Sequence, residues 1–273
     1  MRIWALLMQV KRIPITILTG FLGAGKTTLL RYLLTNSQSR LAVIVNEFGS
    51  VGLDGDLLRT CDICPGDQME NRIVELKNGC LCCTVQDEFL PTMEALIYRS
   101  EELDGIIVET SGLALPRPLL QAIQWPEIRT RVFVDGVVTL VDGEALSQGS
   151  PVGNIESFNE QINKDESLDH LTPINELFNN QLSVADLVLI SRSDLIDKKS
   201  LDQVESRIRS SIRDTTNILS VSHGKIAPSI ILGLDRIDEE IPNDDDHHHL
   251  SVISETIQLE YNVNKEDLQE VLL

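Results

Sequence analysis

Long apolar runs are missing from this 273-residue sequence, and none approaches the ~18 residues that a membrane-spanning helix needs. Basic residues are also scarce, because 23 Lys and Arg stand against 42 Asp and Glu, for a formal net charge of −19. This deficit argues against broad contact with nucleic-acid phosphates or with an anionic membrane surface. The short apolar stretch near the N-terminus runs into Lys11 and Arg12 without a small-residue cleavage site, unlike a signal peptide. We therefore expect a cytoplasmic protein with neither nucleic acid nor membrane as partner.

Cysteine is absent outside one short segment, which holds all five thiols. An odd number of thiols in a cytoplasmic chain argues against a disulfide framework. Three of them, Cys80, Cys82 and Cys83, form a Cys-x-Cys-Cys motif. Thiolates at this spacing are typical ligands of Zn²⁺, Cu(I) or Co²⁺. One alternative is three buried, inert thiols. Another is a closed structural zinc site that also includes Cys61 and Cys64.

Short apolar runs alternate with helical patterns along the chain, which is typical of an α/β fold with a mostly parallel sheet flanked by helices. The apolar runs predict strands at residues 13–19, 41–45, 73–76, 105–108, 136–141, 187–190 and 218–221. Helical spacing predicts helices at residues 26–34, 93–98, 119–123 and 199–212. Residues 147–172 are rich in Asn, Gln, Asp and Glu and read either as a surface insertion or as an ordered surface helix.

The pattern of the sequence predicts four parts of the chain. These are an N-terminal extension at 1–12, an α/β domain at 13–234 that the motif described next makes a P-loop domain, an acidic and His-rich linker at 235–250, and the beginning of a C-terminal α+β domain at 251–273. Residues 251–261 read as a strand and residues 265–273 as the beginning of a helix. These two elements cannot bury a core, so we expect this last domain to be either truncated or completed by something else. His247, His248 and His249 in the linker either bind transition metals loosely or are simply solvated.

A phosphate-binding loop is predicted at residues 20–27, Gly-Phe-Leu-Gly-Ala-Gly-Lys-Thr, which fit G-x-x-x-x-G-K-[ST] between a strand and a helix. Glycines let successive N–H groups point at a phosphate, and the following helix presents its positive end to the same anion. Lys26 supplies a charge for the β- and γ-phosphates, and the Thr27 hydroxyl can bind Mg²⁺. The predicted nucleotide-binding residues of this loop are Gly20, Gly23, Ala24, Gly25, Lys26, Thr27 and Thr28.

Two further strands are predicted to contribute acids. Glu109 follows the apolar run 106–108, at the carboxyl edge where ligands bind in open α/β sheets, and is predicted to face Mg²⁺. Gly112 can bring its N–H close to the γ-phosphate. Together with Lys26 these are the predicted catalytic residues. Glu47 follows the second strand, where it either senses the nucleotide, lends a carboxylate to a metal, or is a solvated turn residue.

A base-binding site is predicted after the strand at 187–190, where Ser191, Arg192 and Asp194 occupy the places of Asn-Lys-x-Asp. An Asp there accepts two hydrogen bonds from guanine N1 and N2. Arg192 can lay its alkyl stem and planar head along the base. The alternative is that Asp194 only caps the next helix. Guanine, and therefore GTP, is the predicted ligand.

Together these motifs resemble the CobW family of P-loop GTPases, most closely its cobalamin-biosynthesis branch. The resemblance to the family is carried by residues 19–28, 46–49, 79–84, 109–112 and 185–195, and the resemblance to this branch by residues 89–94, 110–116, 125–129 and 167–170. It implies a metallochaperone that binds Co²⁺ or Zn²⁺ at Cys80, Cys82 and Cys83 in the Mg²⁺–GTP state and releases it after hydrolysis. The implied recipient is a metal-requiring protein, the cobalt chelatase of cobalamin biosynthesis.

The expected hydrolysis is slow, because no cis arginine finger is evident in the sequence. The sequence is compatible with a homodimer and does not decide the oligomeric state. Two other functions compete with the chaperone. One is a GTPase with a structural zinc site that acts in signalling or assembly, and the other is an ATP-using enzyme on the same scaffold.

Overall fold

The structure is a computed structural model that describes residues 11–46, 73–76, 89–153 and 173–236, all within one compact unit, Met1–Ile237. Its strands form one sheet in the order β3-β2-β4-β1-β5-β6-β7, and every pairing between neighbours is parallel. This confirms the predicted α/β fold. The strands are β1 (Ile13–Gly20), β2 (Leu41–Asn46), β3 (Ile73–Leu76), β4 (Gly105–Glu109), β5 (Val132–Asp142), β6 (Leu187–Ser191) and β7 (Asn217–Ser220).

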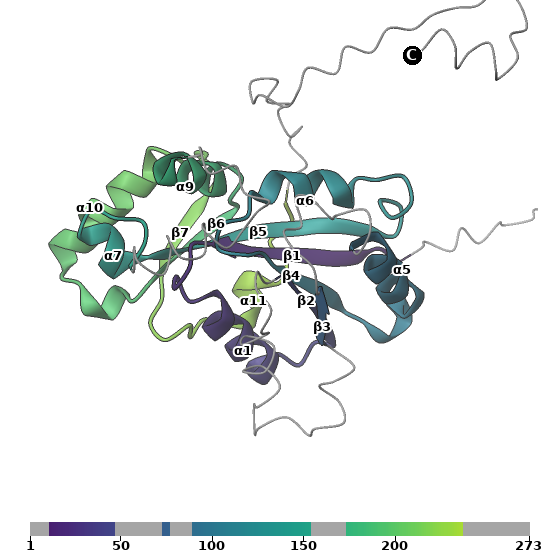
Figure 1. Ribbon diagram of the computed structural model, residues 1–273. Helices are drawn as coiled ribbons and strands as arrows, with labels where there is room; N and C mark the ends of the chain where they lie inside the picture. Colours follow the sequence, from purple (N-terminus) through teal and green to yellow (C-terminus); the bar gives the residue numbers. More distant parts are fainter. Residues whose placement is uncertain (1–10, 47–72, 77–88, 154–172, 237–273) are drawn as a thin grey trace, which may run out of the picture. The chain divides into compact units, whose positions relative to one another are not determined.

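Helices cover both faces of the sheet, with α1 and α11 on one side and α6 and α9 on the other (Figure 1). The α-helices are α1 (Lys26–Asn36), α5 (Leu90–Tyr98), α6 (Pro116–Ile123), α7 (Gly143–Ser147), α9 (Ile174–Ser183), α10 (Lys198–Arg209) and α11 (Pro228–Ile231). Short 3₁₀ turns, η2 (Ser100–Glu102) and η3 (Ser193–Leu195), complete the regular structure. Among the described helices, none has the length and apolar character needed to cross a membrane.

The prediction of a helix at residues 199–212 extends too far at its C-terminal end. The structure ends α10 at Arg209, and the Ser210 hydroxyl donates a hydrogen bond to the Arg207 carbonyl at 2.7 Å. A serine that satisfies a nearby backbone carbonyl competes with continuation of the helix. Helix α9 was not predicted, because its sequence INELFNNQLS carries polar residues between its apolar ones.

Each face of the sheet has its own apolar cluster, and the two clusters hold α1 and α9 against opposite sides of the same strands. On the α1 side, Leu29, Leu30 and Leu33 pack against alternate residues of the strands, such as Leu18 and Leu140. The cluster on the α9 side consists of Phe21, Leu113, Val141, Leu146, Val152, Leu177, Phe178, Leu182, Ala185, Val188, Ile190, Val204 and Ile208. This alternation is expected for a parallel sheet that is buried on both faces.

The segment after α11 is fixed to the amino-terminal end of the sheet. The buried Asp135 carboxylate on β5 accepts hydrogen bonds from the backbone N–H groups of Gly233, Leu234 and Asp235, at 2.7, 3.2 and 3.4 Å. Arg236 donates to the Val184 carbonyl at 3.1 Å. The chain is therefore hydrogen-bonded to the domain as far as residue 236, at the end of the sheet opposite the carboxyl edge.

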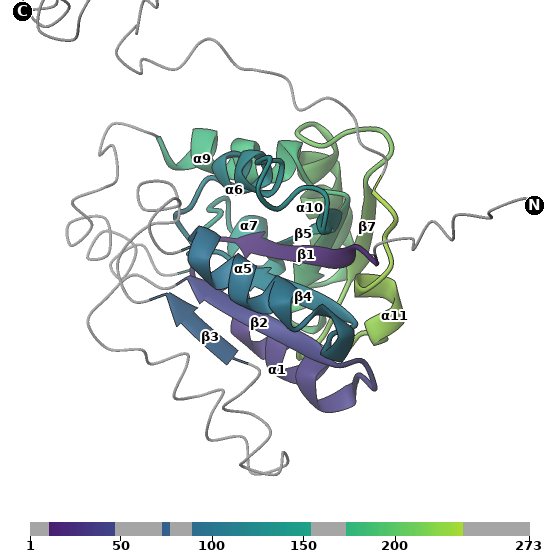
Figure 2. The same ribbon diagram turned by 90° about the vertical axis from the view of Figure 1, so that its right-hand side faces the viewer.

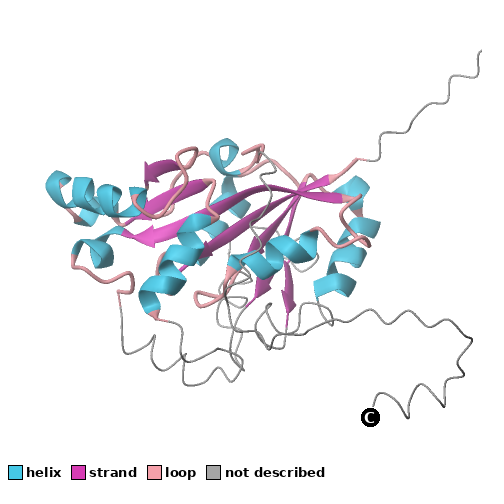
Figure 3. Cartoon of the chain, turned by 90° about the horizontal axis from the view of Figure 1, so that it is seen from above, coloured by secondary structure: helices cyan, strands magenta, loops and turns pink. Residues whose placement is uncertain are grey.

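Figures 2 and 3 show the sheet and its covering helices from two further directions.

Candidate nucleotide-binding site

The glycine-rich loop lies between the end of β1 and the start of α1, as predicted for a P-loop. Gly20, Gly23 and Gly25 all have positive φ angles, of 132°, 74° and 100°. A side chain at Gly20 would also place its Cβ 2.3 Å from the Leu140 carbonyl oxygen, so only glycine fits there. No side chain caps the first turn of α1. Its N–H groups therefore face the loop and suit an anion.

Lys26 is buried, and its ammonium group is folded back onto the loop. Its Nζ donates hydrogen bonds to the carbonyl oxygens of Gly20 at 2.8 Å and Phe21 at 3.2 Å. These bonds hold a positive charge at the centre of the glycine-rich turn. The charge and the first turn of α1 together suit this loop to bind a phosphate.

Thr27 and Glu109 meet across the carboxyl edge of the sheet. The Thr27 hydroxyl donates a hydrogen bond to Glu109 Oε1 at 3.0 Å. Glu109 is the last residue of β4 and is only 4 % exposed. The structure therefore brings together the two residues that the sequence assigned to Mg²⁺.

The loop after β4 lies directly against the P-loop. A Cβ added to Gly112 would lie 2.6 Å from the Leu22 backbone nitrogen, so the two backbones are in contact. Thr110 anchors the start of this loop by donating its N–H to the Leu18 carbonyl at 2.9 Å. Gly112 therefore lies beside the glycine-rich turn of residues 20–25.

A cavity of about 280 Å³ opens between the P-loop, the start of α1 and the loops that follow β6 and β7. It is lined by Gly23, Ala24, Gly25, Thr28, Leu29, Leu140, Ser191, Arg192, Asp194, Leu195, Val221, His223 and Gly224. Seven of these residues belong to the nucleotide-binding set predicted from sequence. Convergence of a phosphate loop and a strand-end Asp on one cavity is the arrangement expected for a nucleotide.

Asp194 is held ionised at this cavity. A hydrogen bond from the Ser222 side chain lowers the pKa of its carboxyl, and so does the charge of His223, whose Nε2 lies 3.9 Å away. An ionised carboxylate offers only acceptors, which suits the two donors of a guanine edge. Sequence reasoning missed His223 and Gly224, although their place directly after the predicted strand at 218–221 was a usable signal.

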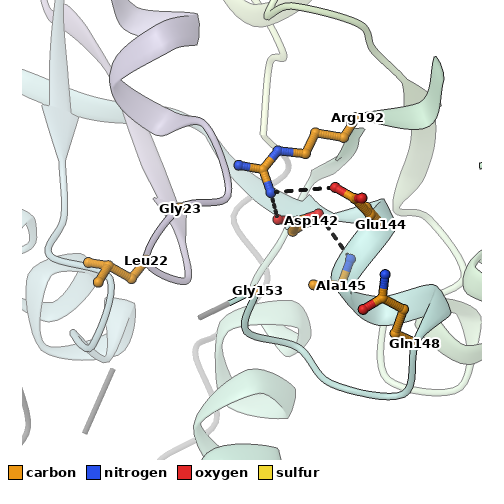
Figure 4. A pocket seen from close by; sticks show the side chains of 8 residues that line it. All are labelled: Leu22, Gly23, Asp142, Glu144, Ala145, Gln148, Gly153 and Arg192. Carbon is orange, nitrogen blue, oxygen red and sulfur yellow. Dashed lines mark hydrogen bonds and ion pairs between the residues drawn. The ribbon is translucent and has the colours of Figure 1, made fainter. Parts of the chain in front are cut away.

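Arg192 extends toward a second, neighbouring cavity of about 500 Å³, where its guanidinium forms an ion pair with Asp142 (Figure 4). Glu144 lies 4.0 Å from the same Nη1 atom. Asp142 is 2 % exposed and also caps α7 by accepting the Ala145 N–H at 3.1 Å. Arg192 lines both cavities, and its backbone is left-handed, with φ 53°. Sequence reasoning did not identify Asp142 as a partner of Arg192 at this cavity, although Asp142 also ends an apolar strand.

Several predicted site residues lie outside the described part of the chain. They are Glu47, the thiols Cys61, Cys64, Cys80, Cys82 and Cys83, and the imidazoles His247, His248 and His249. Within the described ranges, no three His, Cys, Asp or Glu side chains gather as a metal site requires.

Comparison with known proteins gives the family. Residues 14–220 match the nucleotide-binding domain of the CobW/HypB/UreG family. A zinc chaperone CobW of Pseudomonas aeruginosa is 48% identical over 225 residues, which cover 82% of this chain and 60% of that protein. A zinc chaperone CobW of Sinorhizobium is 44% identical over 243 residues, which cover 88% of this chain and 68% of that protein.

The crystal structure of the zinc-bound YjiA GTPase from E. coli has the same fold, with a TM-score of 0.52 and 23% identity, over 96% of this chain and 76% of that one. The matched part of this chain spans about 60% of the length of the zinc chaperone CobW of Pseudomonas aeruginosa. The family match nevertheless contains the P-loop, β4 with Glu109, and the loop after β6. The chain therefore belongs to the CobW/HypB/UreG family, through its nucleotide-binding domain.

Proposed function

We propose that the protein is a GTP-hydrolysing metallochaperone, which takes up a metal ion as cargo in the GTP state and releases it after hydrolysis. The observation that carries the proposal is the meeting of Thr27 and Glu109 at the carboxyl edge of the sheet. Two relatives that carry the name zinc chaperone CobW support the metal-carrying part.

In this proposal, different described residues bind different parts of the nucleotide. Lys26 and the first turn of α1 bind the phosphates, Gly112 approaches the γ-phosphate, and Asp194 selects the base. Ser191 lines the same cavity, but its hydroxyl donates to the Val141 carbonyl at 3.2 Å and so supports the strand end. Hydrolysis is expected to be slow, as for P-loop GTPases that lack an arginine finger in cis.

Mg²⁺ is the metal ion that the nucleotide requires. Thr27 and Glu109 offer it a hydroxyl and a carboxylate oxygen 3.0 Å apart, and hard oxygen ligands of this kind suit Mg²⁺. When bound, Mg²⁺ neutralises charge on the β- and γ-phosphates. Glu109 and Thr27 would hold it at the strand edge, and Lys26 would balance the remaining charge.

The cargo site is proposed at Cys80, Cys82 and Cys83, with Glu47 as a further ligand or sensor. Thiolate ligands accept both Zn²⁺ and Co²⁺. The names of the relatives favour Zn²⁺. With Co²⁺ as cargo, the proposed recipient is the cobalt chelatase of cobalamin biosynthesis. With Zn²⁺ it is a zinc-requiring protein.

The register of the sheet supports a link between nucleotide and cargo. β2 and β3 pair so that Asn46 lies beside Leu76, and β2 and β4 pair so that Val45 lies beside Glu109. Glu47 follows Asn46 directly, and Cys80 comes shortly after Leu76. The segments with the sensor and the thiols therefore begin at the same edge as the Mg²⁺-side carboxylate. Linkage then requires that GTP and cargo strengthen each other's binding by the same factor.

The test is a titration of the metal-free, reduced chain with Zn²⁺ and separately with Co²⁺. It is carried out with Mg²⁺–GTP in a non-hydrolysable form, with Mg²⁺–GDP and without nucleotide. We expect tight binding, and a thiolate-to-cobalt absorbance band, only in the GTP state. Cys82→Ser with Cys83→Ser should abolish this binding, whereas the matched control Cys61→Ser should retain it.

Equal metal affinity in all three nucleotide states would contradict the proposal and indicate a structural metal site. Loss of binding in Cys61→Ser would point to the larger zinc site that includes Cys61 and Cys64. Competition by ATP as strong as by GTP would contradict the guanine assignment.

A further inference from the structure

Helix α9 contacts both of the loops that flank the proposed phosphate site. The ring of Phe178 lies 6.0 Å from the ring of Phe21 in the P-loop, centroid to centroid. One turn later, Gln181 Nε2 donates hydrogen bonds to the carbonyl oxygens of Gly112 and Ala114, both at 3.2 Å. Figures 1 and 2 show α9 beside α6, the helix into which this second loop leads. One helix therefore contacts both loops and is hydrogen-bonded to the second of them.

Gln181 is fully buried, with 0 % exposure. Its backbone is fixed as well, because the Thr139 hydroxyl on β5 donates to the Gln181 carbonyl at 3.1 Å. Two carbonyl acceptors require a donor, so the NH₂ group must face the loop. The amide oxygen Oε1 is left buried without a hydrogen-bond partner in the described structure. The buried amide is therefore retained for the two hydrogen bonds that its NH₂ group donates to the loop, at the cost of an unsatisfied oxygen.

The loop that Gln181 holds is confined from its other side too. Gly112 lies against the backbone of Leu22, as the 2.6 Å approach of an added Cβ shows. Within the loop, the Ala114 N–H donates to the Ser111 carbonyl at 3.1 Å, and Leu113 is 2 % exposed. The loop is therefore clamped between the P-loop and α9.

We propose that Gln181 is a positioning residue for GTP hydrolysis, which holds the peptide groups of Gly112 and Ala114 so that Gly112 stays beside the phosphate site. This inference rests on the proposed GTPase function. Glycine restricts its own backbone least of all residues, so Gly112 depends on outside contacts to keep one conformation. Neither peptide carbonyl can rotate away from Gln181 without breaking a buried hydrogen bond. Misplacement of a reacting group by about 1 Å can lower a rate by about a hundredfold.

The test compares Gln181→Met, which keeps the length but removes both donors, with the wild-type chain. Asn175→Met, at an exposed position of the same helix, is the matched control. Gln181→Asn keeps an amide that is too short to reach both carbonyls, and it replaces Gln181→Met if that variant does not fold. The measurements are kcat and KM for GTP, the affinity for GDP, the thermal unfolding temperature, and nucleotide-free hydrogen exchange at Leu113 and Ala114.

We expect Gln181→Met to lower kcat at least about tenfold while the GDP affinity stays within about twofold, because only the γ-phosphate side of the site is disturbed. Exchange at Leu113 and Ala114 should be faster, and Asn175→Met should match wild type in every measurement.

Two results would overturn the inference while the proposed GTPase stands. One is an unchanged kcat in Gln181→Met. The other is an equal loss of GDP affinity, kcat and unfolding temperature, which is the pattern of a merely structural residue. Failure of the wild-type chain to hydrolyse GTP would overturn the proposed function itself, and this inference with it.

Discussion

Thr27 Oγ1 donates a hydrogen bond to Glu109 Oε1 at 3.0 Å, which joins the second residue of α1 to the last residue of β4. The two residues are separated by 82 positions in the chain. The parallel pairing of β1 with β4 brings them together, because Leu18 lies beside Glu109 in the register. A hydroxyl and a carboxylate are thus held side by side next to the glycine-rich loop, where the proposed GTPase would bind Mg²⁺.

Replacement of Glu109 by Gln is expected to lower GTP hydrolysis by about a hundredfold or more, because it removes a preorganised charge from the site of phosphoryl transfer. The amide keeps the shape and can still pair with Thr27, so thermal stability should change little. Steady-state hydrolysis over a range of Mg²⁺ concentrations measures the effect. Thr35→Val, near the end of the same α1 helix, serves as control and should hydrolyse GTP at the wild-type rate. Normal hydrolysis in Glu109→Gln would show that Glu109 has no part in catalysis.

Asp194→Asn is expected to change the base that the cavity prefers. The carboxylate accepts from both donors of guanine, whereas an amide offers one acceptor and one donor. Guanine then loses a charge-assisted hydrogen bond, and GTP affinity should fall by about a hundredfold. Xanthine carries a carbonyl in place of the 2-amino group and should bind better than guanine. Competition between GTP and XTP for a fluorescent nucleotide measures the exchange. An unchanged preference for GTP would mean that Asp194 does not contact the base. The alternative that Asp194 caps the next helix is already wrong, because Asp197 caps α10 by accepting the Ser200 N–H.

The strands could be predicted from sequence because a buried parallel strand is a short, continuous apolar run. β5 shows where this signal fails. Its first residues, Val132 to Val134, were not predicted because Asp135 and Gly136 follow them. Asp135 is tolerated inside the strand because its carboxylate accepts three backbone N–H groups from residues 233–235. No local pattern encodes a partner nearly a hundred residues away.

The site shows the same division between local and distant information. The P-loop and Glu109 could be recognised because their residues are contiguous or end an apolar run. The contacts of Arg192 with Asp142 and of Gln181 with Gly112 could not, since these pairs are 50 and 69 residues apart. A buried glutamine on an unpredicted helix gives no sequence signal of its own. Only the packing of α9 against the sheet reveals which backbone carbonyls it meets.

The ion pair between Arg192 and Asp142 should be measurable as a coupling energy. We expect Arg192→Ala and Asp142→Asn to be non-additive, with a coupling of about 0.5–3 kcal/mol, because Asp142 is almost fully buried. Urea unfolding of the wild type, both single variants and the double variant gives this value. Glu144 is the matched control, since it lies 4.0 Å from the same guanidinium but is 41% exposed. Its coupling with Arg192 should lie near the lower end for surface pairs, about 0–1 kcal/mol. Equal couplings would show that burial of Asp142 adds nothing.

Asp104 should make stability depend on pH at the acidic end. Its carboxylate accepts from the Arg40 side chain at 3.1 and 2.8 Å and from the Arg40 backbone N–H at 2.9 Å. These hydrogen bonds, with the charges of Arg40 and Lys11, hold the pKa of Asp104 well below its usual 3.8. Since the pKa is lower in the folded state than in the unfolded state, the ionised carboxyl favours folding. This contribution is complete above the usual pKa and is lost as the pH falls below it.

Asp104→Asn should therefore lower the free energy of unfolding at neutral pH, by up to about 1 kcal/mol because the pair is partly exposed to solvent. The difference from wild type should persist to about pH 5 and shrink toward about pH 3, where the wild-type carboxyl is mostly protonated in the unfolded chain. Urea unfolding at these pH values measures it, with the exposed Asp202→Asn on α10 as control. A difference that stays constant across this range would mean that Asp104 acts through the shape of its hydrogen bonds and not through its charge.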